Sequence, residues 1–513
     1  MLFDFAIIGF GVIGVEILQG IKKNLLNNKK RVNKKIKIAI IEKDLNNIPG
    51  GVAYSKKNSK FGFFNNPLRL SHPEFISWFN DKNNKKKLFD FAKKNPNYNL
   101  IKWIEKNRFI LNKSFKNYNE IYLPRLIYSF FLEERIIDFL NCKKRLNVSI
   151  KFFKGEVNNF NNVVHYNIFS KKTFSEFSIN FSNETLKKKI KKKSCYLIKS
   201  KKIIIGTGII PPKKINEVNK IKNSNYIWDF YSSGGTNNLI NKINKIFKIK
   251  KNIRLVFIGN KAGLLETMQE VEKLIKKIKI KIICISKNSL TLQKAERPKK
   301  FEFFQFKYLT KKNIKKIKKT YQILDLLNKE FKKAKIDGFY KYDVWTKTLK
   351  NKIMNSCYNQ LNYHEKKKYN LITFPQIRNM TRYTYPDTVS AKNRLEKRKV
   401  LRFFKDKVIK IIKNKKNIIL KTKNKKTISC DIVVNVSGPV SILENQDEIK
   451  FVTSLKRITK KFNERGFSTN KIFMLENGIY LPGTFSNNFN PGRETIIKAI
   501  TKNAHKVAKN ILN

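Results

Sequence analysis

Residues 2–21 have the sequence LFDFAIIGFGVIGVEILQGI, and residues 36–42 have the sequence IKIAIIE. The apolar run before Gly9 predicts a short buried strand, and the helical spacing of apolar residues after Gly14 predicts a helix. Residues 36–42 predict a second buried strand, which ends in Glu42. A strand, a glycine turn, a helix and a second strand ending in an acid are typical of a dinucleotide-binding βαβ unit.

Each marked residue in this unit has a physical reason to be there. Gly9 permits the tight turn, Gly11 lets the backbone approach a pyrophosphate, and Gly14 lets the helix pack close to the strand. The helix N-terminus then stabilises the phosphates. Glu42 can accept hydrogen bonds from ribose hydroxyls. We therefore expect these four residues to bind a dinucleotide; the alternative is a glycine turn with a purely structural role.

A second unit of the same kind begins near residue 252. It comprises a strand over 252–258, the turn Gly259-Asn260-Lys261-Ala262-Gly263, a helix over 264–275 and a strand over 280–285. Lys261 occupies the second glycine position, where a side chain obstructs close approach of the backbone, and Leu264 occupies the third. Lys287, just after the last strand, could meet a 2′-phosphate. The alternative is a Rossmann-like domain that binds a nucleotide weakly or not at all.

Three further segments end in small residues. Residues 202–208 and 432–439 are apolar strands whose exits contain Gly206, Gly208 and Gly438. These glycines suit places where the chain passes from one nucleotide domain to the other. The third segment, residues 478–484, contains Gly483 and Thr484 and precedes a long amphipathic helix.

The composition excludes several classes of protein. A chain of 513 residues predicts two to four domains, and its 41% hydrophobic content excludes wholesale disorder. No stretch approaches the roughly 20 apolar residues that span a bilayer, and the N-terminus lacks a signal-peptide pattern. We therefore expect a cytoplasmic protein with no membrane partner. Five scattered cysteines and four isolated histidines predict neither a disulfide framework nor a metal site.

The formal net charge of +74 is a weak guide to function. Only 16 of the 111 basic residues are Arg, and the Lys residues occur in every segment alongside Asn and Ile. All three have A/T-rich codons, so a biased genome explains the excess. Nucleic-acid surfaces cluster their charge and rely on Arg. We therefore expect no specific nucleic-acid partner, although non-specific binding at low salt is expected.

Taken together, these features resemble two-dinucleotide flavoproteins, in which an NAD(P)H domain interrupts an FAD domain. More narrowly, the chain is similar to the flavoprotein monooxygenase family that contains FAD-dependent urate hydroxylase and L-aspartate N-monooxygenase. Four segments carry this narrower likeness: Gly50-Gly51-Val52-Ala53-Tyr54-Ser55; Phe64-Asn65-Asn66-Pro67-Leu68-Arg69-Leu70-Ser71, followed by Phe75 and Trp78; Leu123-Pro124-Arg125-Leu126-Ile127-Tyr128; and the region from Gly483 to Thr495. The resemblance covers most of the chain except about Lys299 to Lys426. The departures are Lys261 and Thr484, where many flavoproteins carry Asp.

The resemblance implies an α/β fold of two Rossmann-like domains. The FAD domain would comprise residues 1–235 and 431–513, and the smaller NAD(P)H domain, with a substrate-shaping insertion, residues 236–430. NAD(P)H would reduce FAD, and the reduced flavin with O2 would hydroxylate a small polar substrate, such as an amino acid amine or urate. The basic surface would attract an anionic substrate. Besides the residues of the two turns, the implied cofactor contacts are Gly51, Tyr54, Asn65, Arg69, Gly206, Gly208, Gly438, Gly483 and Thr484.

The residues themselves offer little direct catalytic chemistry. Asn65, Arg69 and His72 follow the first unit, where a cofactor ring would extend, but each could equally be an ordinary loop residue. No Ser-His-Asp triad or carboxylate pair is visible, which fits an enzyme whose flavin does the chemistry. Two alternatives stay open: an NAD(P)H–flavin dehydrogenase without oxygen insertion, and a non-catalytic dinucleotide-binding protein with a basic interaction surface.

Overall fold

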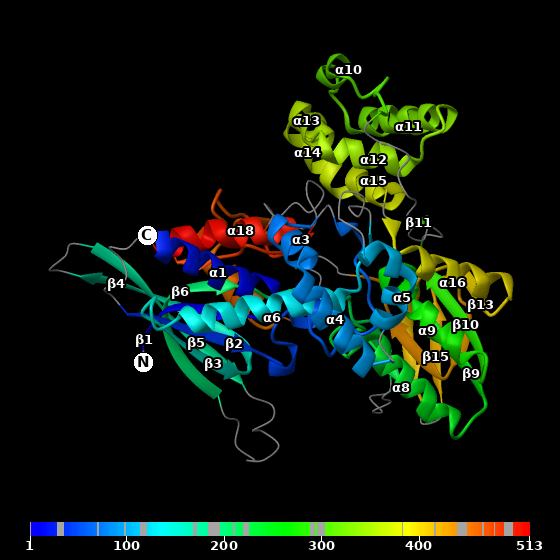
Figure 1. Ribbon diagram of the computed structural model, residues 1–513, viewed down its shortest axis with the longest axis horizontal. Coiled ribbons are helices and arrows are strands. Elements are labelled where there is room, and N and C mark those ends of the chain that lie inside the picture. The colour runs from blue at the N-terminus through cyan, green and yellow to red at the C-terminus, as the bar shows by residue number, and fades with distance from the viewer. Residues whose placement is uncertain are drawn as a thin grey trace.

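The computed structural model shows two α/β bodies beside each other and a helical lobe that projects from them (Figure 1). We call these parts the first body, the second body and the helical lobe. The described residues are 2–27, 35–68, 71–96, 99–112, 121–167, 172–182, 195–208, 211–218, 225–287, 293–294, 303–381, 383–414, 417–438, 449–463, 466–476, 478–486 and 496–512.

The first body is built on a largely parallel sheet with the strand order β20-β21-β6-β1-β2-β3. β1 lies between β2 and β6 and runs parallel to both, while the β4–β5 hairpin joins the sheet through β5. The strands are β1 (Leu2–Ile8), β2 (Ile36–Glu42), β3 (Val148–Lys154), β4 (Glu156–Asn167), β5 (Lys172–Ser182), β6 (Cys195–Ile205), β20 (Met474–Glu476) and β21 (Ile479–Tyr480).

Both faces of this sheet are covered, which explains why β1 and β2 are nearly continuous apolar runs. Phe5 and Ile7 of β1 pack into the core beneath the helices, whereas Ala6 and Ile8 pack into the core on the opposite face. The helices are α1 (Val12–Asn27), α2 (Gly51–Tyr54), α3 (Pro73–Asn80), α4 (Lys82–Lys94), α5 (Asn99–Asn112), α6 (Arg125–Cys142), α17 (Val452–Ile458) and α18 (Ile496–Ile511). A 3-10 helix (Leu45–Asn47) and the small β18 (Phe462–Asn463) and β19 (Gly466–Phe467) pair complete the body.

The second body has a parallel sheet with the order β13-β10-β9-β17-β8. Leu255 and Phe257 of β9 face the helix layer, and Val256 and Ile258 face a four-stranded sheet of order β16-β15-β14-β7. The strands are β7 (Asn216–Val218), β8 (Tyr226–Ile227), β9 (Asn252–Ile258), β10 (Lys279–Ser286), β13 (Leu401–Lys405), β14 (Val408–Lys413), β15 (Ile418–Thr422), β16 (Thr427–Cys430) and β17 (Ile432–Asn435). The helices are α8 (Gly235–Phe247), α9 (Ala262–Leu274) and α16 (Pro386–Lys397).

The helical lobe stands on the parallel pair β11 (Gln293–Lys294) and β12 (Tyr383–Thr384). It has a hydrophobic core of its own, which includes Phe304 and Leu327. The Trp345 side chain of the lobe packs against both this core and the main core of the first body. The helices are α10 (Lys311–Lys315), α11 (Thr320–Ile336), α12 (Lys341–Lys350), α13 (Ile353–Gln360), α14 (Tyr363–Lys368), a π-helix (Tyr369–Thr373) and α15 (Phe374–Thr381).

The sheet membership of β17 bears on the expected domain boundaries. β17 pairs with β9 and β8, so the chain is still in the second body at Asn435. The expected boundary at residue 431, where the chain would return to the first body, therefore lies just before β17, a strand of the second sheet. The sequence did not distinguish the two bodies here, because the apolar run of β17 resembles a strand of either one. We propose boundaries near residues 208 and 438, at the two glycine-containing strand exits, instead of 235 and 431.

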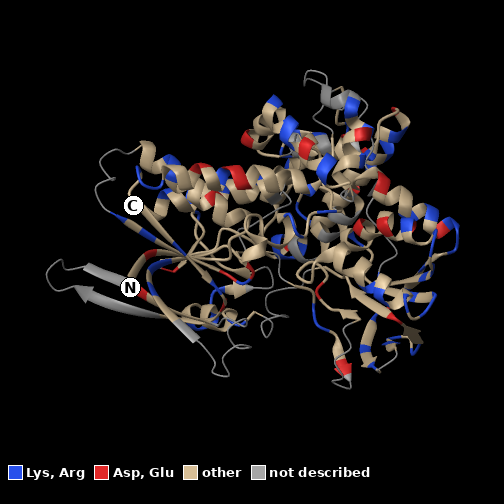
Figure 2. Ribbon diagram, turned by 60° about the horizontal axis from the view of Figure 1, so that its bottom comes forward, with Lys and Arg blue, Asp and Glu red and all other residues tan. Residues whose placement is uncertain are grey.

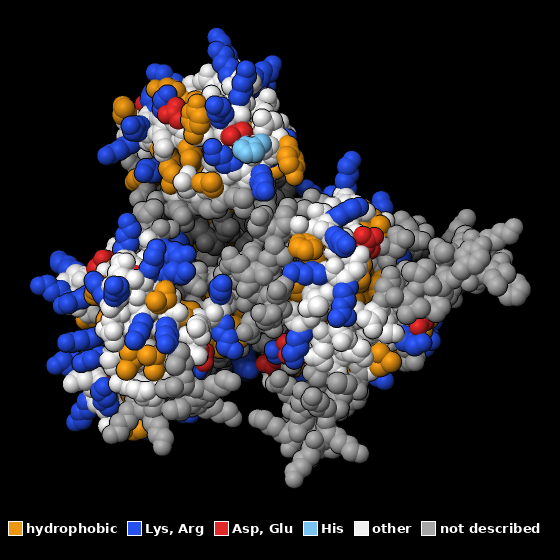
Figure 3. All heavy atoms as spheres, turned by 180° about the vertical axis from the view of Figure 1, so that it is seen from behind, with side chains coloured by type: hydrophobic (Ala, Val, Ile, Leu, Met, Phe, Trp, Pro, Cys, Tyr) orange, Lys and Arg blue, Asp and Glu red, His pale blue; other side chains and the backbone are white. Residues whose placement is uncertain are grey.

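The basic residues that the structure describes are spread over the molecule. Lys and Arg lie on all parts of the ribbon in Figure 2, and Figure 3 shows them scattered over the displayed face. Within the described residues, no helix has the length and apolar character needed to cross a membrane, and no group of metal-ligating side chains forms a metal site.

Candidate functional site

The first glycine turn lies at the carboxyl edge of the first sheet, where β1, β2 and β6 end together. The Gly9 amide donates to the Ile41 carbonyl at 2.8 Å, and the Gly206 amide donates to the Ile8 carbonyl at 2.8 Å. Gly9 has a φ of 85°, and a Cβ there would stand 3.0 Å from the Thr207 backbone. This position therefore requires glycine both for its backbone conformation and for the close approach of β6.

Gly11 and Gly51 face each other beside the N-terminus of α1. A Cβ on Gly51 would stand 3.2 Å from the Gly11 Cα, and the φ of Gly51 is 64°. The Gly11 carbonyl accepts the first bond of the helix, from the Val15 amide at 3.2 Å. Two side-chain-free backbones thus border the positive end of α1, as an approaching pyrophosphate requires.

Gly14 has a different role from the one expected. A Cβ on Gly14 would stand 2.5 Å from the Phe10 ring, so this glycine makes room for Phe10. The Phe10 ring is fully buried and packs edge-on against Phe152 of β3. Close packing of α1 on the strands instead depends on Ile13, because a Cβ on Gly483 would stand 2.6 Å from its Cδ1 atom.

The second glycine turn repeats the backbone plan of the first. Gly259 has a φ of 103°, its amide donates to the Ile285 carbonyl at 2.8 Å, and the Val436 amide donates to the Ile258 carbonyl at 2.9 Å. Lys261 therefore corresponds to Gly11, and its carbonyl likewise accepts the first bond of the helix, from the Leu265 amide at 3.3 Å.

The contact between the helix and the strand exits has its glycine on the strand side in the first unit and on the helix side in the second. In the first turn, Ile13 on the helix packs between Gly206 and Gly483 at the strand exits. In the second, the helix carries the glycine: a Cβ on Gly263 would stand 2.7 Å from a Val436 side-chain carbon. The glycine and the branched residue at the contact between helix and strand exit are therefore exchanged between the two units.

Known proteins share this architecture. A family model described as FAD-NAD(P)-binding matches residues 6–166. No curated protein sequence matches the chain. Ornithine N-hydroxylase from Kutzneria sp. 744 has a TM-score of 0.52 at 10% identity, over 100% of this chain and 99% of its own. L-lysine 6-monooxygenase from Pseudomonas syringae has a TM-score of 0.52 at 10% identity, over 99% and 98%. FAD-bound cadaverine monooxygenase from Erwinia amylovora has a TM-score of 0.50 at 11% identity, over 100% and 94%.

The chain has the two-dinucleotide-binding flavoprotein fold. At these identities the solved structures establish the fold, and the expectation of two Rossmann-like domains, one interrupting the other, is confirmed.

Within the flavoprotein fold, Glu42 lies beside the first turn as expected, and it also supports that turn. Its carboxylate accepts from the Phe10 amide at 2.7 Å and from the Asp44 amide at 3.1 Å. Burial raises the pKa of Glu42, although these backbone bonds act in the opposite direction. A role toward a ribose stays a prediction.

The strand exits of β6 and β21 meet at the same edge. The Thr484 hydroxyl donates to the Gly208 carbonyl at 2.9 Å, and a Cβ on Gly208 would meet no atom of the described residues within 4 Å. Thr207 carries a buried hydroxyl oxygen with no hydrogen-bond partner among the described residues. At the corresponding exit of β17, Gly438 has a φ of 91°, and a Cβ there would likewise meet none of the residues that the structure describes.

The loop after Gly62 contacts the first body and the chain that returns from the helical lobe. Phe64 packs against Tyr54 and Tyr128, which places Tyr54 in an aromatic cluster that supports the loop. On its other side, the Asn65 amide oxygen accepts from the Thr384 hydroxyl at 3.2 Å, and Phe63 stacks on Tyr385 with ring centroids 3.9 Å apart. Residues 63–65 are therefore positioned by α6 and by the chain returning from the helical lobe.

Two other predicted residues and part of the closing segment need a separate statement. Lys287 is exposed immediately after β10, at the carboxyl edge of the second sheet. Arg69 lies outside the described residues, as does residue range 487–495 of the closing segment.

A buried ion pair between the two bodies was not predicted. Arg125, the first residue of α6, donates from Nε to the Phe63 carbonyl at 3.0 Å and from a terminal nitrogen to the Glu266 carboxylate of α9. Only 11% and 10% of these two side chains are exposed. Burial lowers the pKa of Arg125, but the facing carboxylate and the neighbouring tyrosines together raise it by more. The net pKa is therefore raised, and the guanidinium stays charged. No sequence pattern links residues this far apart in the chain.

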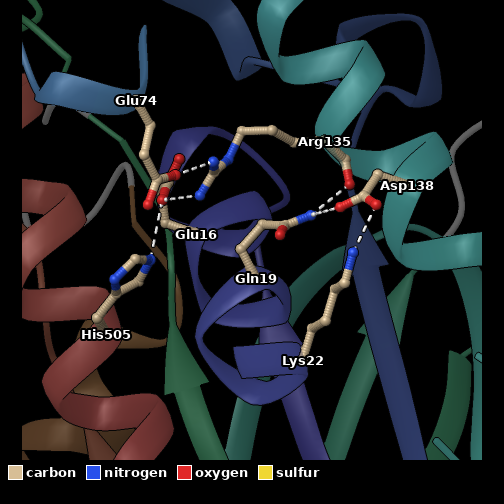
Figure 4. A network of polar contacts seen from close by, with 7 residues as sticks. All are labelled: Glu16, Gln19, Lys22, Glu74, Arg135, Asp138 and His505. Carbon is tan, nitrogen blue, oxygen red and sulfur yellow. Dashed lines mark hydrogen bonds and ion pairs between the residues drawn. The ribbon is translucent and has the colours of Figure 1, made fainter. Parts of the chain in front are cut away.

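A second unpredicted network ties the helices of the first body together (Figure 4). The fully buried Glu16 of α1 accepts from Arg135 of α6 at 2.8 Å and lies 3.1 Å from the His505 ring nitrogen of α18. Arg135 also pairs with Glu74 of α3. His72, which precedes α3, is buried beside this network, and its burial lowers its pKa. The network fixes α3, and with it the end of the loop that contains Asn65, against the dinucleotide helix.

Proposed function

We propose that this protein is an FAD-dependent, NAD(P)H-using monooxygenase that hydroxylates a small amine. One observation carries the proposal: two glycine turns with the same backbone plan lie in two bodies held together by the buried Arg125–Glu266 pair. The similar structures support it, since they are a cadaverine monooxygenase, an ornithine N-hydroxylase and an L-lysine 6-monooxygenase.

The residues at the first turn fit FAD. Gly11 and Gly51 leave backbone exposed at the α1 N-terminus for the pyrophosphate, and the Glu42 carboxylate has lone pairs left for ribose hydroxyls. Thr207 offers an unpartnered hydroxyl oxygen beside the open Gly208. FAD, when bound, supplies electron transfer and oxygen activation, whereas the chain supplies binding and orientation.

The residues at the second turn favour NADPH over NADH. The position that corresponds to Glu42 is Ser286, because Ile41 and Ile285 occupy equivalent places against the two turn glycines. A carboxylate there would repel a 2′-phosphate, and instead the next residue is Lys287. Position 261 has no glycine backbone that could approach a phosphate closely, but the Lys261 ammonium can bind a phosphate as a point charge.

We place the substrate between the loop at Asn65 and the second body. The substrate class is a small amine, for which the basic surface favours a carboxylate-bearing molecule such as an amino acid. Hydroxylation of urate at carbon is the competing chemistry. We also propose a cytoplasmic location and no specific nucleic-acid partner, because the charge is diffuse.

The test uses purified, FAD-loaded protein with NADPH in air. A panel of lysine, ornithine, cadaverine, aspartate and urate is assayed for NADPH oxidation, for hydroxylated product and for H2O2. Product that matches the NADPH consumed, with one of the amines, supports the proposal. NADPH oxidation that yields only H2O2 across amines of all chain lengths would instead identify a flavin dehydrogenase without oxygen insertion. Absence of bound flavin would reject both.

A further inference from the structure

A cavity of about 430 Å³ lies where α5 of the first body meets α9 and α16 of the second. Its lining residues are Phe63, Asn99, Lys102, Trp103, Gln269, Glu272, Lys273, Tyr385, Asp387, Ser390 and Arg394. The residues from α9 belong to the C-terminal half of that helix. Lys273 is twelve residues after Lys261, about 18 Å along the axis at 1.5 Å per residue. The cavity is therefore separate from the second glycine turn.

α5 contains two lysines one turn apart, Lys102 and Lys106, of which only Lys102 lines the cavity, and their surroundings are opposite. The Lys106 ammonium pairs with both oxygens of Asp387, at 2.6 and 2.7 Å. Lys102 instead faces Lys273 of α9, which it influences both through its charge and through a side-chain contact. Among the described residues, no carboxylate lies within ion-pair distance of Lys102.

The carboxylates in the wall are already neutralised. Glu272 is held by Arg394 through two bonds of 2.6 and 2.8 Å, and Asp387 is held by Lys106. Lys273 pairs with Glu270 and nevertheless has a lowered pKa, first because of desolvation and further because of Lys102. Lys102 is thus the cavity lysine without a carboxylate partner among the described residues, and Lys273 of the other body, which is paired with Glu270, lies opposite it.

The floor of the cavity is aromatic. Phe63, Trp103 and Tyr385 are between 3% and 8% exposed, and the rings of Phe63 and Tyr385 are stacked. A flat apolar group can lie on such a floor while a charged group reaches the lysines. Like-charged ammonium groups in contact repel each other, and a doubly charged oxyanion between them converts this repulsion into two attractions.

We propose that this cavity binds a phosphate-bearing small molecule, whose phosphate bridges Lys102 of the first body and Lys273 of the second. Lysine suits this role because its ammonium binds phosphate as a compact point charge. The bound phosphate ties α5 to α9 and so stabilises one relative position of the two bodies. The cavity borders the region proposed for the substrate, because Phe63 of the Asn65 loop lines it, but its phosphate binding does not depend on the proposed monooxygenase activity.

The test measures binding to the FAD-loaded protein by calorimetry, at constant ionic strength set with chloride. The probes are inorganic phosphate and phenyl phosphate. We expect Lys102→Gln and Lys273→Gln each to weaken phosphate binding at least tenfold, and Lys102→Arg to retain it. The control is Lys242→Gln combined with Lys245→Gln, since these lysines line a second cavity of about 420 Å³ on a single helix. The control should change binding less than twofold.

The outcomes separate the ligand sources and can reject the site. Tighter binding of phenyl phosphate than of phosphate, lost in both glutamine variants, identifies an organic phosphate whose flat group lies on the aromatic floor. Binding of phosphate alone identifies the free ion. Equal affinity in the wild type and both glutamine variants, or an equal loss in the control, would show that phosphate binds elsewhere or through diffuse charge, and the proposal would be abandoned.

Discussion

Replacing Gly11 with alanine should separate cofactor binding from folding. A Cβ at Gly11 would stand 3.6 Å from the Gly51 Cα, an ordinary van der Waals distance, so the protein itself can accept it. The substitution restricts the unfolded chain, which stabilises by about 0.4–1 kcal/mol, but it places a poor residue at the helix N-cap. These effects oppose each other, so the free energy of unfolding of the apoprotein should stay within about 1 kcal/mol of the wild type.

If the pyrophosphate approaches the backbone between Gly11 and Gly51, the added methyl group should obstruct it. Losing one backbone hydrogen bond to a charged group costs about 1.5–3 kcal/mol, which corresponds to a roughly 10- to 150-fold higher Kd for FAD. Gly206→Ala is the matched control for stability, because its Cβ would stand 2.7 Å from the Gly9 carbonyl oxygen. Overpacking against fixed backbone should cost that variant about 1–3 kcal/mol.

Two measurements decide this prediction. Urea unfolding of the apoproteins gives stability, and quenching of flavin fluorescence gives the Kd of FAD. Wild-type FAD affinity in Gly11→Ala would refute the placement of the pyrophosphate at this turn. A loss of stability as large as in Gly206→Ala would refute the geometric reasoning.

Four further residues allow direct tests. Glu42→Ala should weaken FAD by about 1.5–3 kcal/mol, the range for hydrogen bonds to a charged group, and an unchanged Kd would leave Glu42 with only its role of supporting the Phe10 amide. Lys261→Ala should slow anaerobic reduction of FAD by NADPH in stopped flow and remove part of its salt dependence; faster reduction in Lys261→Gly would show instead that the side chain closes the site. Glu266→Ala should lower the free energy of unfolding by about 3–5 kcal/mol, because it leaves the Arg125 charge buried without its carboxylate. Adding Arg125→Met should recover part of that loss in urea unfolding. Strictly additive effects of the two substitutions would contradict a direct pair. The pKa of His72 is lowered in the fold, so its contribution to stability is present above the unfolded-state pKa near 6.5 and is lost as the pH falls through the folded-state pKa. His72→Phe should therefore flatten the decline of the unfolding free energy below about pH 6.5. Parallel pH profiles of the wild type and the variant would exclude this role.

The sequence predicted the parts of this molecule that depend on local chemistry. The order of strand, glycine turn, helix and strand identified both bodies, because the conformation at Gly9 and Gly259 is determined within a few residues. The packing of Phe10 against Gly14 was not predicted, since the Phe10 ring also packs edge-on against Phe152, a residue of β3. Local patterns carry no information about such a distant partner.

Long-range charge pairing was equally inaccessible to sequence reasoning. Arg125 lay in a segment noted for its family likeness, but its partner Glu266 carried no signal of its own, and in a chain with 111 basic residues no single lysine or arginine stands out. The strand β17 was assigned to the wrong body for a similar reason. Its apolar residues are compatible with either sheet, and only pairing with β9 distinguishes them.

The exchange of glycine between the two turns restricts how either one can change during evolution. In the first turn a larger residue at Gly483 requires a smaller one at position 13, and in the second a larger residue at Gly263 requires a smaller one at position 436. Neither side chain of a pair can become larger first without loss of stability. The larger residue must therefore be replaced by a smaller one before its partner can become larger. Relatives of this chain should therefore show covariation of positions 13 and 483, and independently of positions 263 and 436, with the summed side-chain volume of each pair nearly constant.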